Sequence, residues 1–315
     1  MSSSAVSAAS SAASSLRVIV GPTAAGKSAV AMALAESNGG AIVSADSRQV
    51  YRGFDIGTAK PGAADRARVK HFGVDVADPT EQWSAARFAS AASGWIDDAR
   101  TGAHTPVLVG GTGLWVSALV SPLAPVPDLD PLRRAALHAE FAARTDAELR
   151  EWCAQLDPAI ARLGPAQWRR AIEVALLTGR RLSEWHADTP GSTACGVRYL
   201  LVDPGDALEK RIAARIDDML AAGWMDEVRD LARAVPLTAI AWKACGYERL
   251  RVALDSRAAS ASVRDDVVRE TRQYARRQRT WFRRQLRHGP VTMLDPAAPG
   301  ALDVSRAWWD GARDS

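Results

Sequence analysis

The residues best suited to chemistry form a glycine-rich loop, GPTAAGKS, at positions 21–28. The loop fits the pattern G-x-x-x-x-G-K-[S/T] and lies between an apolar run at 16–20 and a helical pattern at 29–36. Backbone N–H groups of such a loop, with the positive end of the following helix, bind the phosphates of di- or triphosphate compounds. The residues assigned to this diphosphate- or nucleotide-binding site are Gly21, Pro22, Thr23, Ala24, Ala25, Gly26, Lys27 and Ser28.

Two side chains of the loop have separate predicted tasks. The Lys27 ammonium would reach the terminal phosphates, and the Ser28 hydroxyl would bind Mg²⁺, which is the expected cofactor. A fortuitous glycine turn is the alternative, but its position directly after an apolar strand favours phosphate binding.

One acidic residue is expected near this loop. Asp46 closes the apolar run AIVSAD at 41–46, whereas the run PVLVGG at 106–111 ends in glycine and is followed by Thr112, without a carboxylate. A kinase or ATPase usually has an Asp at the end of a second apolar strand, where it holds Mg²⁺ through water. The sequence therefore leaves two roles open for Asp46, magnesium ligand or general base.

The elements that must position these residues alternate between strand and helix patterns. Such alternation predicts an α/β fold with a parallel sheet flanked by helices. A strand is expected again at 197–202, followed by long helices at 207–235 and 263–288 and a last edge strand at 291–294. The patterned segments of the first part are Leu16–Val20, Ala29–Glu36, Ala41–Ser44, Trp83–Arg100 and Pro106–Val109.

A helical segment interrupts this alternation. The proline-rich piece SPLAPVPDLD at 121–130 breaks the pattern, and only helical spacing follows it as far as about Trp185. We therefore expect an α/β catalytic domain at 16–124 and 196–315 that ends in basic helices, with a small all-helical insertion domain at 125–195. Residues 1–15, nearly all Ser and Ala, are expected to form a disordered tail.

Composition bounds the location of the protein. No apolar run approaches the roughly eighteen residues of a membrane span, so we expect a cytoplasmic protein without membrane contact. The three cysteines, Cys153, Cys195 and Cys245, are odd in number for a disulfide framework and too far apart for a metal clip. All three are expected to be reduced, and the protein is expected to be a monomer.

Basic residues are concentrated in one segment. The formal net charge is only +4, yet residues 264–288 contain nine arginines against three acidic residues, an excess of six positive charges. The aromatic residues of this segment, Tyr274, Trp281 and Phe282, follow a helical stripe and are expected in the core. A solvated charged face is one interpretation, but such a surplus favours contact with an RNA phosphate backbone.

The segment DSRQVYRGFDIGTAKP at 46–61 is polar, aperiodic and punctuated by glycine, which is typical of a site loop, with an ordinary surface loop as the alternative. It resembles the D-S-x-Q-x-Y-x-G-x-D-I-G-T-A-K-P signature of the tRNA dimethylallyltransferase (isopentenyltransferase) family. Other stretches are similar and follow the family's order. They are GPTAAGKS, DPTEQWSAARF, LVGGTGLW, RRAIEV, the helix with Arg211 and Arg215, CGYERL and TRQYARRQRTWFRR.

This resemblance implies a P-loop NTPase-like fold whose phosphate loop holds dimethylallyl diphosphate. The partner would be tRNA, with the adenosine on the 3′ side of the anticodon flipped out of its loop, since its N6 is otherwise stacked away from any active-site group. Asp46 would then be the general base that accepts the N6 proton. Lys27 and a basic side chain would stabilise the leaving diphosphate, and Thr112 would position the substrate.

Arg211 and Arg215 lie four residues apart beside the apolar stripe of a predicted helix, so both can point at one anion. A solvated pair bound to Glu209 or Asp218 is the alternative. The resemblance makes Arg215 the diphosphate clamp and Arg211 its neighbour.

The resemblance also assigns residues to tRNA, including positions in the insertion domain that would bind the anticodon stem and loop. The match is weaker at GPAQW, residues 164–168, where the family often has Asn-Asp or arginine-rich residues. The tRNA-binding residues implied are Asp46, Ser47, Arg48, Gln49, Lys60, Thr112, Arg134, Gln167, Arg170, Lys243, Gly246, Tyr247, Arg276 and Arg277.

Other functions remain open at this point. A P-loop kinase of a small metabolite or nucleotide would use Asp46 as a magnesium ligand or base and would consume ATP without RNA. An RNA-binding module with a vestigial phosphate loop would bind tRNA without chemistry, but the intact Lys27–Ser28 pair argues against it. An adenylate isopentenyltransferase would share the loop and Asp46 but has no need of a large basic surface.

Overall fold

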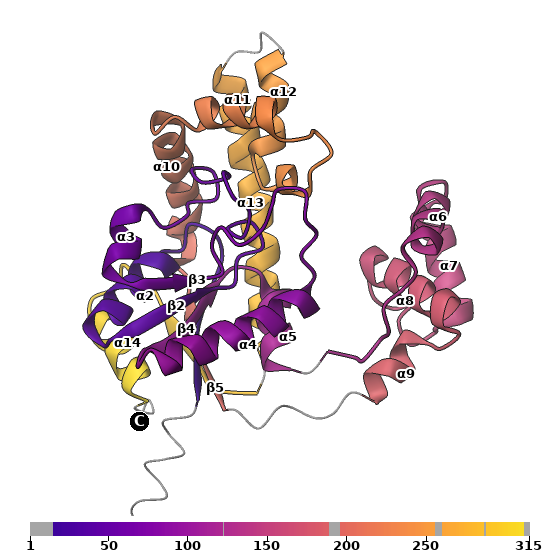
Figure 1. Cartoon of the computed structure of the whole chain (residues 1–315), viewed down its shortest axis with the longest axis horizontal. Helices are drawn as coiled ribbons and strands as arrows, with labels where there is room; N and C mark the ends of the chain where they lie inside the picture. Colours follow the sequence, from indigo (N-terminus) through magenta and orange to yellow (C-terminus); the bar gives the residue numbers. More distant parts are fainter. Residues whose placement is uncertain (1–14, 122, 189–195, 256–259, 287, 312–315) are drawn as a thin grey trace, which may run out of the picture. The chain divides into compact units, whose positions relative to one another are not determined.

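The structure is a computed structural model that describes residues 15–121, 123–188, 196–255, 260–286 and 288–311 (Figure 1). The predicted tail at 1–15 lies outside these described residues except for Ser15. The chain divides into two compact units, one made of residues 1–120 and 194–315 and the other of residues 121–193. These divisions fall within a few residues of the expected limits of the catalytic and insertion domains.

The first unit is built on one parallel sheet of six strands in the order β3-β2-β4-β1-β5-β6. The α/β prediction is confirmed, including the last strand at the edge. The one strand that the sequence did not predict is β3, which has three residues and no buried side chain. The strands are β1 (Leu16–Val20), β2 (Gly40–Ser44), β3 (Lys70–Phe72), β4 (Thr105–Gly110), β5 (Val197–Val202) and β6 (Val291–Leu294).

Side chains of alternate strand residues point to opposite faces, and helices cover both faces. Ile19 faces a core that includes α2 and α14, whereas Val18 and Val20 face a larger core that includes α4, α5, α10 and α13. The helices of this unit are α2 (Lys27–Ser37), α3 (Ala63–Arg68), α4 (Ala85–Thr101), α5 (Gly113–Val120), α10 (Leu208–Ala221), α11 (Trp224–Ala234), α12 (Tyr247–Asp255), α13 (Ser260–Gln285) and α14 (Ala301–Asp310), with short 3-10 helices η1 (Gly205–Ala207) and η2 (Ile240–Lys243).

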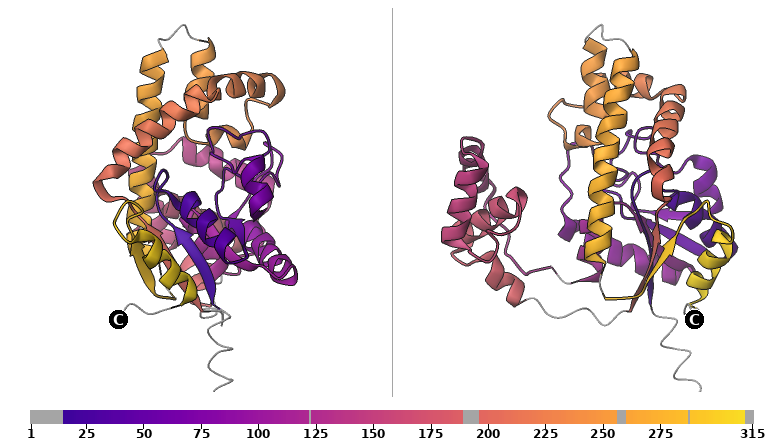
Figure 2. Two further views of the ribbon diagram at one scale, coloured as in Figure 1. Left: turned by 90° about the vertical axis from the view of Figure 1, so that its left-hand side faces the viewer. Right: turned by 180° about the vertical axis from the view of Figure 1, so that it is seen from behind.

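The helix predicted at 207–235 is two helices. Gly223 has φ of 95°, a left-handed conformation that ends α10 and precedes α11. The helix predicted at 263–288 is confirmed as α13, whose 26 residues begin slightly earlier. Figure 2 shows α13 as a long helix that extends from the sheet toward α11 and α12. Helix α13 packs against α10 and α12, and its Gln278 side chain contacts the loops that follow β1 and β4.

The second unit is all helical and has its own core. Leu149, Cys153 and Ile172 are fully buried there, and Thr145 and Glu148 form a capping box at the start of α7. The helices are α6 (Pro131–Ala142), α7 (Asp146–Leu156), α8 (Pro165–Thr178) and α9 (Leu182–Ala187). Within the described residues of both units, no helix is long and apolar enough to cross a membrane.

Candidate active site

The phosphate loop joins the end of β1 to the start of α2, as the motif predicts. Gly21 has φ of 148°, and a Cβ at this position would lie 2.1 Å from the Val202 carbonyl oxygen. Gly26, with φ of 103°, directly precedes the first residue of α2. Any other residue would be strained at both positions, so the backbone of the loop depends on glycine.

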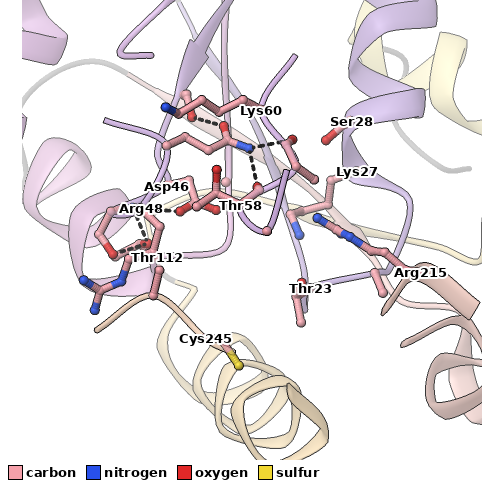
Figure 3. A pocket seen from close by; sticks show the side chains of 18 of the residues that line it. Thr23, Lys27, Ser28, Asp46, Arg48, Thr58, Lys60, Thr112, Arg215 and Cys245 are labelled. Atoms are coloured by element: carbon pink, nitrogen blue, oxygen red, sulfur yellow. Dashed lines mark hydrogen bonds between the residues drawn. The ribbon is translucent and has the colours of Figure 1, made fainter. Parts of the chain in front are cut away.

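This loop forms one wall of a cavity of about 530 Å³ (Figure 3). Its lining includes Lys27 and Ser28 from the loop side, Asp46 and Thr112 from the ends of β2 and β4, and Arg215 from α10. Residues that are far apart in the sequence are thus brought together as predicted. Further predicted residues that line the cavity are Thr23, Ala24, Ser47, Arg48, Gln49, Lys60, Lys243 and Arg277.

Two cations of this cavity have no carboxylate in contact. The Lys27 ammonium donates a hydrogen bond to the Pro22 carbonyl oxygen at 2.7 Å. Burial, and then the nearby positive charge of Arg215, lowers the pKa of Lys27 to about 7, although Asp46 opposes this effect. Burial also lowers the pKa of Arg215. Neither side chain has an ion pair within the part of the chain that the structure describes, so their charge is available to an anion.

Arg211 differs from Arg215, although both leave the same helix. Its Nε donates to the Ala24 carbonyl oxygen at 3.0 Å, and its side chain is exposed and does not line the cavity. Arg211 therefore supports the phosphate loop from outside the cavity, while Arg215 lines the cavity.

Backbone contacts fix Asp46 and Thr112 relative to each other. The Thr112 hydroxyl accepts a hydrogen bond from the Ser47 N–H at 3.0 Å, and the Thr112 N–H donates to the Ala45 carbonyl at 3.2 Å. One carboxylate oxygen of Asp46 accepts from the Arg48 N–H at 2.9 Å. The other oxygen has no hydrogen bond within the described ranges, so it can accept a proton or bind a cation.

Two of the residues predicted to bind tRNA use their polar groups in hydrogen bonds and ion pairs within the protein. The Gln49 amide donates to the carbonyls of Thr58 and Ala59 and accepts from the Ser44 hydroxyl. Lys60, with a side chain only 2% exposed, forms ion pairs with Asp55 at 2.6 Å and Asp75 at 2.5 Å. Both residues line the cavity, but in this conformation they hold the loop rather than present free groups to RNA.

Tyr247 and Gly246, which were predicted to contact tRNA, are both buried in the structure. The Tyr247 side chain is fully buried, and its hydroxyl donates to Glu227 at 2.6 Å and accepts from the Gly57 N–H. A Cβ on Gly246 would lie 2.4 Å from the Trp224 ring. Tyr247 therefore holds the loop at 55–57 through its hydroxyl, and Gly246 makes room for the Trp224 ring.

Helix α13 contributes residues that the sequence reasoning missed. Phe282 is 1% exposed, as expected of a core residue, but Tyr274 lines the cavity. Burial and the negative charge of Asp46 raise the pKa of Tyr274, and Arg277 lies over its ring at 5.9 Å. Gln278 also lines the cavity. The helical spacing of apolar residues predicts which positions face inward, but it does not distinguish residues packed in the core from residues that line a cavity.

Many arginines of α13 are neutralised by acidic residues of other elements. Glu209 on α10 pairs with Arg276 at 2.7 Å and with Arg272 at 3.6 Å. Arg279 pairs with Asp203, directly after β5, at 2.5 Å. The excess of six positive charges counted within residues 264–288 therefore overstates the positive electrostatic potential at the surface of this helix. Arg277, which has no ion pair within the described residues, is left facing the cavity.

In the helical unit, Arg134 and Arg170, both predicted to bind tRNA, form ion pairs with the same buried carboxylate. Glu173, 3% exposed, accepts hydrogen bonds from both arginines and from His138 at 3.0 Å. Gln167 is exposed at the start of α8. The two arginines remain partly exposed, so the cluster orders cationic groups on the surface of this unit.

These features define the class of protein. A parallel sheet whose first strand leads into a G-x-x-x-x-G-K-S loop at the wall of a cavity defines an α/β protein of P-loop-like fold. The sequence model described as "IPP transferase" matches residues 49–285, and the one described as "Isopentenyl transferase" matches residues 14–71. The chain belongs to the IPP transferase family.

Relatives and solved structures agree with this assignment. The chain is 44% identical to the tRNA dimethylallyltransferase of Stenotrophomonas maltophilia strain R551-3, over 85% of this chain and 89% of that protein. It is 43% identical to that of Sorangium cellulosum, over 86% and 88% respectively. The full-length tRNA isopentenylpyrophosphate transferase of Bacillus halodurans has a TM-score of 0.66 at 31% identity, covering 94% of each chain. A eukaryotic dimethylallyltransferase acting on tRNA shares the fold, with a TM-score of 0.74 at 23% identity over 95% of this chain and 76% of its own. These comparisons give no support to the kinase alternative.

Proposed function

We propose that this protein transfers a dimethylallyl group from dimethylallyl diphosphate to N6 of the adenosine on the 3′ side of the anticodon in tRNA. The observation that carries the proposal is one cavity in which a phosphate loop with unneutralised Lys27 and Arg215 lies with the carboxylate of Asp46. Relatives that share 44% of the sequence are named for this activity on tRNA.

The cations would hold the donor and stabilise the leaving group. Loop N–H groups, Lys27 and Arg215 would bind the two phosphates, whose charge grows as the bond from the allylic carbon to the phosphate oxygen breaks. The same cavity is lined by apolar side chains of α10, Ile212, Ile216 and Met219, which suit a five-carbon chain.

The carboxylate would act on the acceptor. The N6 nitrogen forms its new bond to the allylic carbon as diphosphate departs, and Asp46 would take the N6 proton through its free oxygen. Thr112, hydrogen bonded to the Ser47 N–H beside Asp46, would position the base. Because adenosine N6 is stacked inside an RNA loop, the base must be flipped out to reach this cavity.

The residues present suit Mg²⁺. Mg²⁺ is usually bound by few protein groups together with substrate phosphates and water, and the Ser28 hydroxyl, which would hold it, lines the cavity beside the phosphate loop. When bound, Mg²⁺ would neutralise charge on the diphosphate.

Contact with tRNA would spread over several surfaces. Exposed Lys243 and Arg277 at the cavity, Arg48 in its lining and Arg276 on α13 would bind RNA phosphates near the flipped base, and Arg134, Gln167 and Arg170 would bind the anticodon stem and loop. The monomeric state and the cytoplasmic location stay predictions.

Mass spectrometry of tRNA nucleosides tests the proposal. A strain that lacks this gene should lose N6-dimethylallyladenosine or its methylthio derivative, and restoring the gene should return the signal. Purified protein should release diphosphate from dimethylallyl diphosphate only when tRNA is added. An unchanged nucleoside signal, or ATP consumption without RNA, would contradict the proposed function.

A further inference from the structure

We infer that Gln278 is a positioning residue, whose side-chain amide sets the phosphate loop against the loop that carries Thr112. This inference deepens the proposed function and rests on it. Gln278 lies on α13 and is 7% exposed. It stands apart from the arginines around it because its polar atoms are directed at backbone groups of two other elements.

Both ends of the Gln278 amide are used. Its Oε1 accepts a hydrogen bond from the Thr23 N–H in the phosphate loop at 2.8 Å. Its Nε2 donates to the Gly111 carbonyl oxygen, which follows β4, at 2.8 Å. Because β1 and β4 are neighbours in the sheet, one side chain spans the gap between two adjacent strand ends.

A carboxamide can make the two contacts together, because it carries both a donor and an acceptor. A carboxylate accepts but does not donate, and an ammonium donates but does not accept. Gly111 is matched to this side chain, since a Cβ there would lie 2.4 Å from Nε2 of Gln278. The Gln278 side chain of α13 therefore joins the phosphate loop to the loop that follows β4.

In the proposed reaction, one of these loops binds the donor's diphosphate and the other lies beside the general base, Asp46. Thr23 belongs to the diphosphate cradle, and Gly111 precedes Thr112, whose hydroxyl binds the Ser47 N–H beside Asp46. Gln278 therefore fixes how far the donor's phosphates lie from the residue that would take the proton. Misplacement of reacting groups by about 1 Å can cost on the order of a hundredfold in rate.

The test compares three variants of the full chain. Gln278→Ala removes both hydrogen bonds, and Gln278→Glu keeps the acceptor for Thr23 but loses the donor for Gly111. Gln273→Ala is the control, because Gln273 is an exposed glutamine on the same helix with no hydrogen bond among the described residues. Three quantities are measured: affinity for inorganic diphosphate with Mg²⁺, affinity for tRNA, and the single-turnover rate of transfer.

We expect Gln278→Ala to lower diphosphate affinity and the single-turnover rate by roughly tenfold each, with tRNA affinity within about twofold of the parent protein. Gln278→Glu should be impaired at pH 8 and recover as the pH falls, because protonation of the carboxyl group restores a donor for the Gly111 carbonyl. Gln273→Ala should match the parent protein in all three measurements.

Two results would overturn the inference. One is a folded Gln278→Ala protein with unchanged diphosphate affinity and rate. The other is a parallel loss of diphosphate affinity, tRNA affinity and melting temperature together with a pH-independent Gln278→Glu defect, since this would show general destabilisation. If the parent protein transfers no dimethylallyl group, the proposed function fails, and diphosphate affinity still decides the role of Gln278.

Discussion

Two lysines that line the same cavity have opposite surroundings. Lys60, in the loop at 46–61, is held by the carboxylates of Asp55 and Asp75. Lys27, in the phosphate loop, has a carbonyl oxygen and a neighbouring arginine instead, and its pKa is lowered to about 7. A buried charge without a counterion is unfavourable. The difference is the basis for our proposal that Lys60 stabilises the fold, whereas Lys27 binds an anionic ligand.

The largest effect expected from this comparison is on Lys27→Met. This variant removes a cation that would stabilise the leaving diphosphate, so kcat/KM for dimethylallyl diphosphate should fall by about 10³-fold. The free energy of unfolding should stay the same or rise, because a buried charge with no counterion is lost. Initial rates and chemical denaturation measure the two quantities. A Lys27→Met protein that is markedly less stable than the parent would break the comparison.

Lys60→Met should behave in the opposite way. It leaves Asp55 and Asp75 without their shared cation, and we expect a loss of about 2 kcal/mol in the free energy of unfolding, discounted because both carboxylates are partly exposed. Urea denaturation measures this loss. At a temperature where the variant is folded, its affinity for inorganic diphosphate should remain close to that of the parent. Equal stability with lost diphosphate binding would reverse the roles assigned to the two lysines.

The pH dependence of diphosphate binding sharpens the account of Lys27. Bound anionic phosphates favour the charged ammonium, so its pKa should rise on binding. Below pH 7 the lysine is already protonated and contributes no pH dependence. Above pH 7 binding takes up a proton, and this group should weaken affinity by up to about tenfold per pH unit.

Calorimetry in buffers of different ionisation enthalpy would detect this proton uptake. Lys27→Arg is the matched control, because arginine stays charged across the range and removes the lysine's contribution to the slope. Identical pH slopes for the parent and Lys27→Arg would contradict the lowered pKa.

The smallest effect concerns the surface of α13, where charges are paired as at Lys60. Glu209→Gln releases Arg272 and Arg276 from their ion pairs, so tRNA affinity should rise by about two- to threefold and depend more steeply on salt. Binding titrations at several salt concentrations measure this change. Unchanged affinity would show that these arginines do not face RNA.

Local sequence patterns were enough to predict most of the fold and the phosphate loop. Strands such as Leu16–Val20 and Val197–Val202 are short apolar runs, and GPTAAGKS has a fixed backbone requirement at its glycines. Strand β3 was not predicted because its three residues are partly exposed and show no apolar pattern. The break at Gly223 was missed because the apolar periodicity continues on both sides of it.

Relations between distant residues could not be predicted in this way. Gln278 contacts Thr23, 255 positions away in the chain, and nothing in the local pattern of α13 singles it out. The burial of Tyr247 depends on Glu227 and Gly57, which lie on other elements. Likewise, the ion pairs that neutralise α13 come from α10 and the end of β5. Each of these features arises from packing between elements, which the sequence alone does not define.

The most direct test of the central claim is single-turnover transfer by Asp46→Asn, with tRNA affinity measured on the same protein. The amide keeps the shape of the side chain but cannot accept the N6 proton. We predict a fall of about 10³-fold in the transfer rate, within the range for loss of a general base, with tRNA affinity within about twofold of the parent. A transfer rate close to that of the parent would contradict the assignment of Asp46 as the base.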